Sequence, residues 1–288
     1  MNRNVDLESH GTDSAAEEAP PSIAKMVWLW IVQQVPAIIV FLLFLLGWQG
    51  VVWLYELPRI LLPTPLLVLS TLWEERIALG KGFLATGLAA MLGLFSSVLI
   101  GSCVSIAFSQ AQWVRRAFYP YVIFLQTVPI VAIAPLLVTW SGYGFRTIVM
   151  VAAIISLFPI ISNVTTGLIS IDSNLRDLFQ LHRASKWQEL IKLRIPHALS
   201  HLILGMRISA GLAVIGAIVG EFFLATTAAE FPGLGAIMTG WQNQSKTAEV
   251  IAAIAVSTVL GLLVLTLVNL FGKFALRRWT QSVGFENE

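Results

Sequence analysis

Few residues of this chain have the type and spacing that catalysis or metal binding requires. His197 and His201 lie four residues apart on a predicted helix, the spacing of a metal-binding pair, but no third ligand lies nearby. We interpret them as two interfacial histidines. The single cysteine, Cys103, excludes an intrachain disulfide and a multi-cysteine zinc site. With no G-x-x-x-x-G-K-S/T loop, paired carboxylates or nucleophile elbow, we expect a protein that is not an enzyme, holds no metal and does not itself hydrolyse ATP.

Some polar side chains interrupt long apolar stretches, where they are costly unless they face a cavity or a partner. Gln126 and Thr127 lie near the middle of one stretch, and Pro129 frees backbone carbonyls that a pathway could use. Glu221 lies near the predicted outer end of another stretch. We interpret it either as a gate residue or as a terminal carboxylate that reaches bulk water or Lys246.

The composition identifies the elements that must hold these residues. Of 288 residues, 57% are hydrophobic and 12% are charged, about half the charge of a soluble domain. The net charge of +2 gives no case for nucleic-acid binding. Five charge-free gaps, and a sixth apolar stretch broken by Arg207, each exceed the ~20 residues that cross a bilayer. We therefore predict an all-α integral membrane protein with six transmembrane helices, at about 27–50, 83–109, 117–140, 146–167, 198–224 and 251–273.

The basic residues predict the orientation of these helices. If the amino terminus is cytoplasmic, most of the 18 lysines and arginines fall on the inner side, so we expect both termini to be cytoplasmic. The predicted domains are an acidic disordered tail at 1–22, a first transmembrane helix at 23–55, the main transmembrane domain at 56–280 and a C-terminal tail at 281–288.

Two of the predicted outer segments contain short helices. Residues 54–82 indicate a turn followed by an interfacial helix. Residues 225–250 contain Pro232-Gly233-Leu234-Gly235 before a weakly polar helix. This second segment could dip back into the protein or form a surface hairpin.

The longest predicted inner loop, 170–197, reads as two short amphipathic helices at an angle. Asp172 and Ser173 can cap the first, and Ser185 with Gln188 forms a capping-box pattern for the second. Pro196 fits the first turn of the next membrane helix. The pair is either an elbow on the bilayer surface or a docking site for a soluble subunit.

Residue identities in this loop resemble the "EAA" loop of ABC importer permeases. Three segments match the spacing of the loop motif, in the same order: Asp177-Leu178-Phe179, Arg183-Ala184-Ser185 and Leu193-Arg194-Ile195-Pro196. Over about residues 55–280 the chain resembles the nitrate/sulfonate/taurine branch of those permeases. The fragments that carry this resemblance are Leu62-Pro63-Thr64-Pro65, Gln126-Thr127-Val128-Pro129, Ala134-Pro135-Leu136, Ser141-Gly142-Tyr143-Gly144, Phe158-Pro159-Ile160 and Ala184-Ser185-Lys186-Trp187-Gln188.

The loop departs from the family pattern at four positions. Asp177 replaces a glutamate, and Leu178 and Phe179 replace two alanines, which makes the loop bulkier and more apolar. Arg183 replaces the glycine between the two helices. A glycine there adopts the left-handed backbone conformation at little cost in free energy. We expect either a tighter turn that avoids positive φ or an ATPase partner with a matching groove; loss of docking is a third interpretation.

The resemblance implies a permease subunit of an ATP-driven, binding-protein-dependent importer in the bacterial inner membrane. Its solute would be a sulfonate, nitrate or a vitamin precursor, and the weakly charged predicted path favours a neutral or aromatic one. The implied partners are a second permease copy, cytosolic ATPase subunits, an external substrate-binding protein and the lipid bilayer. The implied ATPase-coupling residues are Asp177, Leu178, Phe179, Arg183, Ala184 and Ser185.

The same resemblance places the helix containing Gln126 beside the translocation path. The expected path residues are Gln126, Thr127, Pro129 and Glu221, with interhelical hydrogen bonding as the alternative role for Gln126. The rival function is a secondary transporter or channel that works without an ATPase. Such proteins often show inverted repeats and acidic residues at mid-membrane, and neither is evident here.

Overall fold

The computed structural model describes residues 23–224 and 232–280, with side chains at 35–224 and 232–276. Every regular element in those ranges is helical, which confirms the predicted all-α fold class. The predicted tails at 1–22 and 281–288 lie outside the described residues. The chain divides into two compact units, with the boundary between Tyr55 and Glu56.

The first unit contains helix α1 (Ile23–Leu54), which covers the predicted membrane helix at 27–50. Its 32 residues correspond to a length of about 48 Å at 1.5 Å per residue. That length exceeds the ~30 Å of a hydrocarbon core. Its large apolar side chains, such as Phe41 and Leu46, are exposed, as expected of a helix whose solvent is lipid.

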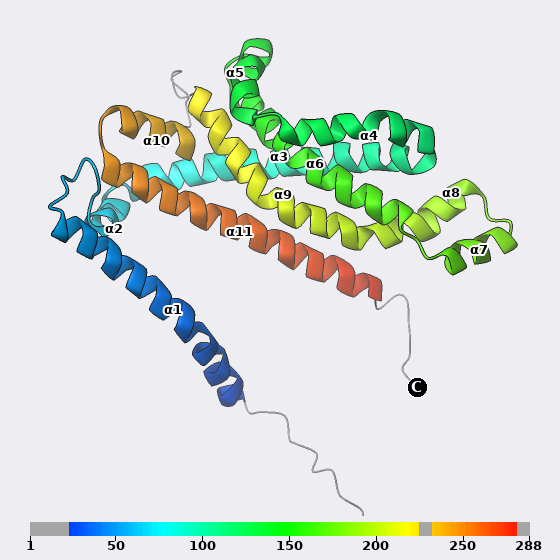
Figure 1. Ribbon diagram of the computed structural model, residues 1–288, viewed down its shortest axis with the longest axis horizontal. Coiled ribbons are helices and arrows are strands. Elements are labelled where there is room, and N and C mark those ends of the chain that lie inside the picture. Colours follow the sequence, from blue (N-terminus) through cyan, green and yellow to red (C-terminus); the bar gives the residue numbers. More distant parts are fainter. Residues whose placement is uncertain (1–22, 225–231, 281–288) are drawn as a thin grey trace, which may run out of the picture. The chain divides into compact units, whose positions relative to one another are not determined.

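Three long helices form the centre of the second unit: α3 (Arg76–Gln110), α6 (Phe145–Ile169) and α9 (Ile195–Leu224). They pack against one another, with α6 contacting both of the others (Figure 1). Small residues permit the close approach. A Cβ added at Gly93 would lie 2.5 Å from Ala152 Cβ, and one added at Gly216 would lie 2.7 Å from Ala152 Cα.

Other helices of this unit pack on the central three. Helix α11 (Thr247–Thr280) packs along α9, and the short helices α2 (Pro65–Glu74) and α10 (Leu234–Asn243) both contact α11. Helix α10 also packs on α9 and α3 and buries Leu234, Met238 and Trp241. The segment from Pro232 onward therefore folds back against the bundle, as one of the two sequence interpretations expected.

Among the residues that the structure describes, five helices are long and apolar enough to cross a membrane, and α4 (Gln112–Thr127) with α5 (Ile130–Ser141) can form a sixth span as a bent pair. The prediction of one continuous helix over 117–140 is wrong, because the chain bends by 101° between α4 and α5. Pro129 offers no N–H to the helix and disfavours helical backbone at the residue before it. Val128 is accordingly extended, with φ −74° and ψ 124°.

The predicted loop between α6 and α9 contains α7 (Ser173–Leu181) and α8 (Lys186–Glu189), here called the elbow together with the turn between them. The second helix does not end before the membrane helix, contrary to prediction, because one helix runs from Lys186 to Leu224. A π-helical turn at Leu190–Arg194 makes this possible. The Ile195 N–H bonds to the Leu190 carbonyl, five residues back, and the wider turn accommodates Pro196, which has no N–H.

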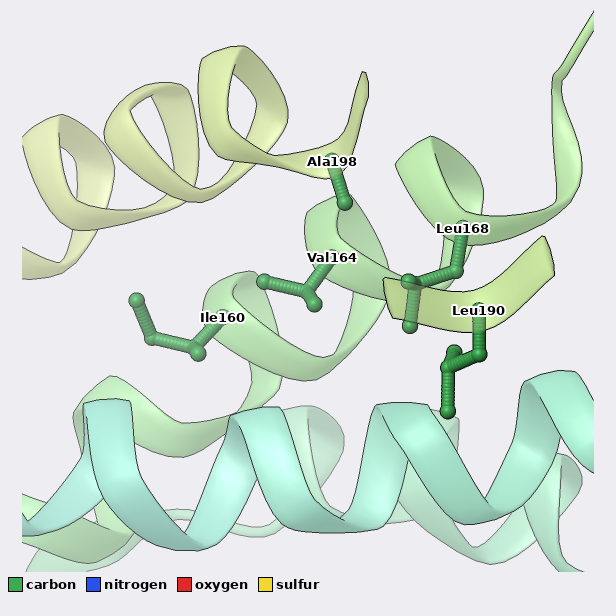
Figure 2. Close-up of a cluster of buried hydrophobic side chains, with 5 residues drawn as sticks. All are labelled: Ile160, Val164, Leu168, Leu190 and Ala198. Atoms are coloured by element: carbon green, nitrogen blue, oxygen red, sulfur yellow. The ribbon is translucent and has the colours of Figure 1, made fainter. Parts of the chain in front are cut away.

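A buried apolar cluster packs the C-terminal end of the elbow against the helix bundle. Leu190, from the π-turn, packs with Ile160, Val164 and Leu168 of α6 and with Ala198 of α9 (Figure 2). All five side chains are buried. Burial of each larger side chain contributes about 1.5–3 kcal/mol, so α8 is held to α6 as firmly as a core element.

Candidate functional site

The turn of the elbow contains a residue in the left-handed region, Arg183, with φ 51°. The Ala184 N–H bonds to the Phe179 carbonyl at 3.0 Å, and the Arg183 N–H bonds to the Gln180 carbonyl at 2.9 Å. This pair of bonds is the Schellman ending of a helix, which needs a left-handed residue. The expected tighter turn that avoids positive φ is therefore wrong, and Arg183 adopts the conformation at a cost of about 1 kcal/mol relative to glycine.

Side-chain caps start both helices of the elbow. The Asp172 carboxylate accepts from the Asn174 N–H at 2.9 Å. At α8, the Gln188 N–H donates to Ser185 Oγ at 3.2 Å, and the Ser185 N–H donates to Gln188 Oε1 at 2.8 Å. The predicted capping box is confirmed.

An apolar groove of about 340 Å³ lies between the two helices of the elbow. Among the expected coupling residues, Leu178, Phe179 and Ala184 line it. The other three, Asp177, Arg183 and Ser185, are exposed and do not line it. His182, Gln188 and Lys192 complete the wall. The elbow thus presents a concave surface whose wall combines apolar side chains with a histidine, an amide and a lysine.

A charged pair that the sequence did not suggest connects the elbow to α3. Arg194 Nη2 lies 2.6 Å from Glu189 Oε1, and Arg194 Nη1 donates to the Ser109 carbonyl at 3.1 Å. The side chains of Glu189 and Arg194 are 13% and 16% exposed. Residues five apart do not face each other on an α-helix. The π-turn between them changes the register, so a search at α-helical spacing misses this pair.

A cavity of about 560 Å³ lies where α4 and α5 meet, here called the break cavity. Three of the four expected path residues, Gln126, Thr127 and Pro129, line it together with residues of α6 and α9. The Thr127 hydroxyl donates to the Phe124 carbonyl at 2.8 Å. No hydrogen-bond partner of the Gln126 amide is found in the described part of the chain, so the alternative of an interhelical bond has no support there. Their part in transport stays a prediction.

Glu221 lies apart from the break cavity, at the junction of α3, α9 and α10. Its side chain is 2% exposed and accepts from Thr86 Oγ1 at 2.8 Å and from the Gly235 N–H at 2.7 Å. Thr86 Oγ1 in turn accepts from the Leu234 N–H at 2.8 Å. The interpretation in which this carboxylate reaches bulk water or Lys246 is wrong, because Glu221 is buried against the start of α10.

Glycines make this junction possible. A Cβ at Gly233 would overlap the Glu221 carboxylate, and one at Gly235 would lie 2.9 Å from Glu221 Cβ. From the sequence this segment could dip back into the protein or form a surface hairpin, and nothing in it identified the carboxylate that the glycines approach. Thr86 and Glu221 are 135 residues apart in the chain.

Comparisons with known proteins agree with this arrangement. A family model described as "binding-protein-dependent transport system inner membrane component" matches residues 93–281. The riboflavin transport system permease protein of Chloroflexus aurantiacus is 32% identical over 84% of this chain and 88% of its own. The formylaminopyrimidine transport permease protein of Halalkalibacterium halodurans is 33% identical over 70% of this chain and 80% of its own.

Other matches extend to different solutes and to a solved structure. The taurine transport system permease protein of Escherichia coli K12 is 30% identical over 83% of this chain and 88% of its own. The inward-facing methionine ABC transporter MetNI superposes with a TM-score of 0.58 at 18% identity, covering 71% of this chain and 97% of that one. At that identity the likeness shows a shared fold.

Proposed function

The chain belongs to the family of binding-protein-dependent transport system inner membrane components, and on that basis we propose that two copies form the solute pathway of an ATP-driven importer. Cytosolic ATPase subunits drive it, and an external binding protein delivers the solute. Both termini lie in the cytoplasm, as the basic residues indicate. The solute is small, of the class of a sulfonate, nitrate or a vitamin precursor.

The observation that carries this proposal is the geometry of the elbow. Its groove presents Leu178, which is 49% exposed, beside the half-buried Phe179. An exposed apolar concavity of this kind is suited to a partner surface. Leu190, in the π-helical turn that follows α8, belongs to the bundle core. A force applied at the groove therefore reaches the membrane helices through packed side chains.

The proposed docking role is tested by placing charge in the groove. Leu178→Asp with Phe179→Asp should abolish solute-stimulated ATP hydrolysis in proteoliposomes that contain the permease, its ATPase subunit and its binding protein. The two carboxylates would replace apolar parts of the groove wall and would lose hydration when a partner covers them, which opposes docking. Folding of the variant is checked by its elution profile in detergent.

A matched variant separates the groove from the helix as a whole. Gln180→Asp with Leu181→Asp adds the same charge to the same helix at positions that do not line the groove. It should retain stimulated hydrolysis. Equal loss in both pairs, or unchanged transport in the first, would contradict docking through the groove.

A further inference from the structure

The break cavity combines a size suited to a small solute with a wall that carries no formal charge. Its volume of about 560 Å³ falls within the range of ligand pockets. All fifteen lining residues are uncharged, and most are apolar, among them Ile133, Ile154, Phe158 and Leu212. Arg207 precedes the lining residue Ile208 in the chain but does not itself line the cavity.

The polar groups on this wall are neutral donors and acceptors. The Gln126 amide carries both, and no partner for it is found among the described residues. The Leu125 carbonyl lacks its helical partner, because the residue four positions on is Pro129. Asn163 Nδ2 is committed to the Pro159 carbonyl at 2.8 Å, which leaves its amide oxygen available. Ser162 Oγ lies 3.2 Å from the Tyr119 hydroxyl.

We propose that the break cavity binds an uncharged, largely apolar ring system that carries neighbouring N–H and C=O groups, in preference to a sulfonate or another anion. An anion would lose its hydration there without meeting a cation, which is far more costly than burying a neutral amide-like edge. Such an edge can pair with the Gln126 amide and the free carbonyl of Leu125. The site assignment rests on the proposed function, since it makes the cavity part of the solute pathway.

The test uses the reactivity of a cysteine placed in the cavity. Cys103 is the single cysteine of the chain, so Cys103→Ser gives a cysteine-free background. In that background, Thr127→Cys, which lines the cavity and leaves the Gln126 amide in place, is alkylated with N-ethylmaleimide in purified permease in nanodiscs, with lumichrome or 2-naphthalenesulfonate present. Both probes are planar fused rings; lumichrome is uncharged with an imide edge, and the other is an anion.

Lumichrome at about twice its Kd should slow alkylation about threefold, because two thirds of the sites are then occupied. The sulfonate should leave the rate unchanged. Ser200→Cys, an exposed position outside the cavity, should be insensitive to both probes. Equal or stronger protection by the sulfonate, or no protection by lumichrome, would overturn the proposal.

A second variant tests the electrostatic reason for the selectivity. Ile154→Lys, added to the Thr127→Cys chain, places a cation on the wall and should confer protection by the sulfonate. Ile154→Met, which adds no charge, should not, and sulfonate protection in that variant would contradict the argument. The assay contains no ATPase, so a failure of ATPase coupling and a failure of this inference are separately visible.

Discussion

Arg183 adopts a backbone conformation that side chains rarely take, in order to end α7. Its left-handed φ of 51° places the Ala184 N–H on the Phe179 carbonyl. The family resemblance identified this position as the place of a glycine, and a glycine adopts the same conformation without a Cβ penalty. The sequence therefore identified Arg183 as unusual for this position, but it did not show that Arg183 adopts the left-handed conformation.

Replacing Arg183 with glycine should stabilise the elbow. The expected gain is about 1 kcal/mol, or about fivefold slower exchange of the Ala184 amide hydrogen. Arg183→Ala keeps the Cβ and should give no gain. The measurement is hydrogen exchange followed by mass spectrometry over residues 182–190. Equal or faster exchange in the glycine variant would contradict the expected cost of a Cβ at this left-handed position.

Glu221 illustrates a contact that no local pattern contains. The sequence identified it as an acidic residue near a helix end, which is correct, but the same position suits a solvated carboxylate. Its actual partners, Thr86 and the Gly235 N–H, come from α3 and α10. Only the packing of three helices brings them together, so the burial of the carboxylate could not be deduced from spacing along the chain.

Among the elements, long helices were predictable and their interruptions were not. Charge-free gaps indicated the positions of α3, α6 and α11, and an apolar stretch broken by Arg207 indicated α9, because the bilayer excludes charge over a fixed length. Proline alone does not mark a break, since Pro120, Pro135 and Pro159 all lie inside helices. Pro129, in contrast, lies between α4 and α5, where the chain bends by 101°.

The link between α8 and α3 should depend on Arg194. Arg194→Ala leaves the nearly buried Glu189 without its close partner and removes the donor to the Ser109 carbonyl, at a cost of about 1–3 kcal/mol. The measurement is hydrogen exchange across 186–195 together with coupled ATP hydrolysis in proteoliposomes.

Arg176 provides the matched control for that link. It lies 3.6 Å from the same carboxylate, but its side chain is 54% exposed. An exposed pair of this kind contributes at most about 1 kcal/mol. Arg176→Ala should therefore leave both measurements nearly unchanged. An effect as large as that of Arg194→Ala would show that the loss of either cation beside Glu189 has the same consequence. The hydrogen bond from Arg194 to α3 would then not explain the result.

At the scale of the molecule, the contact between α6 and α9 should limit which side chains the bundle tolerates. Gly216→Ala places a methyl group 2.7 Å from the Ala152 backbone, which cannot yield as a flexible side chain does. Overpacking of this kind costs about 1–3 kcal/mol. The expected result is a lower midpoint of thermal unfolding in detergent.

Gly211 lies on the same helix and supplies the comparison. A Cβ there meets nothing within 4 Å, so Gly211→Ala should be neutral or stabilise the helix by up to about 1 kcal/mol. If both alanine variants melt alike, close packing at Gly216 does not govern the stability of the bundle.

The unbroken helix from Lys186 to Leu224 has a mechanical consequence. Its 39 residues extend over about 58 Å at 1.5 Å per residue. Its closest glycine contact with α6, at Gly216 against Ala152, lies far along the chain from the elbow and close to Glu221. A rod that pivots there is a lever with unequal arms. A wide swing at the elbow becomes a short, opposite and more forceful displacement at the Glu221 end, where the start of α10 is seated.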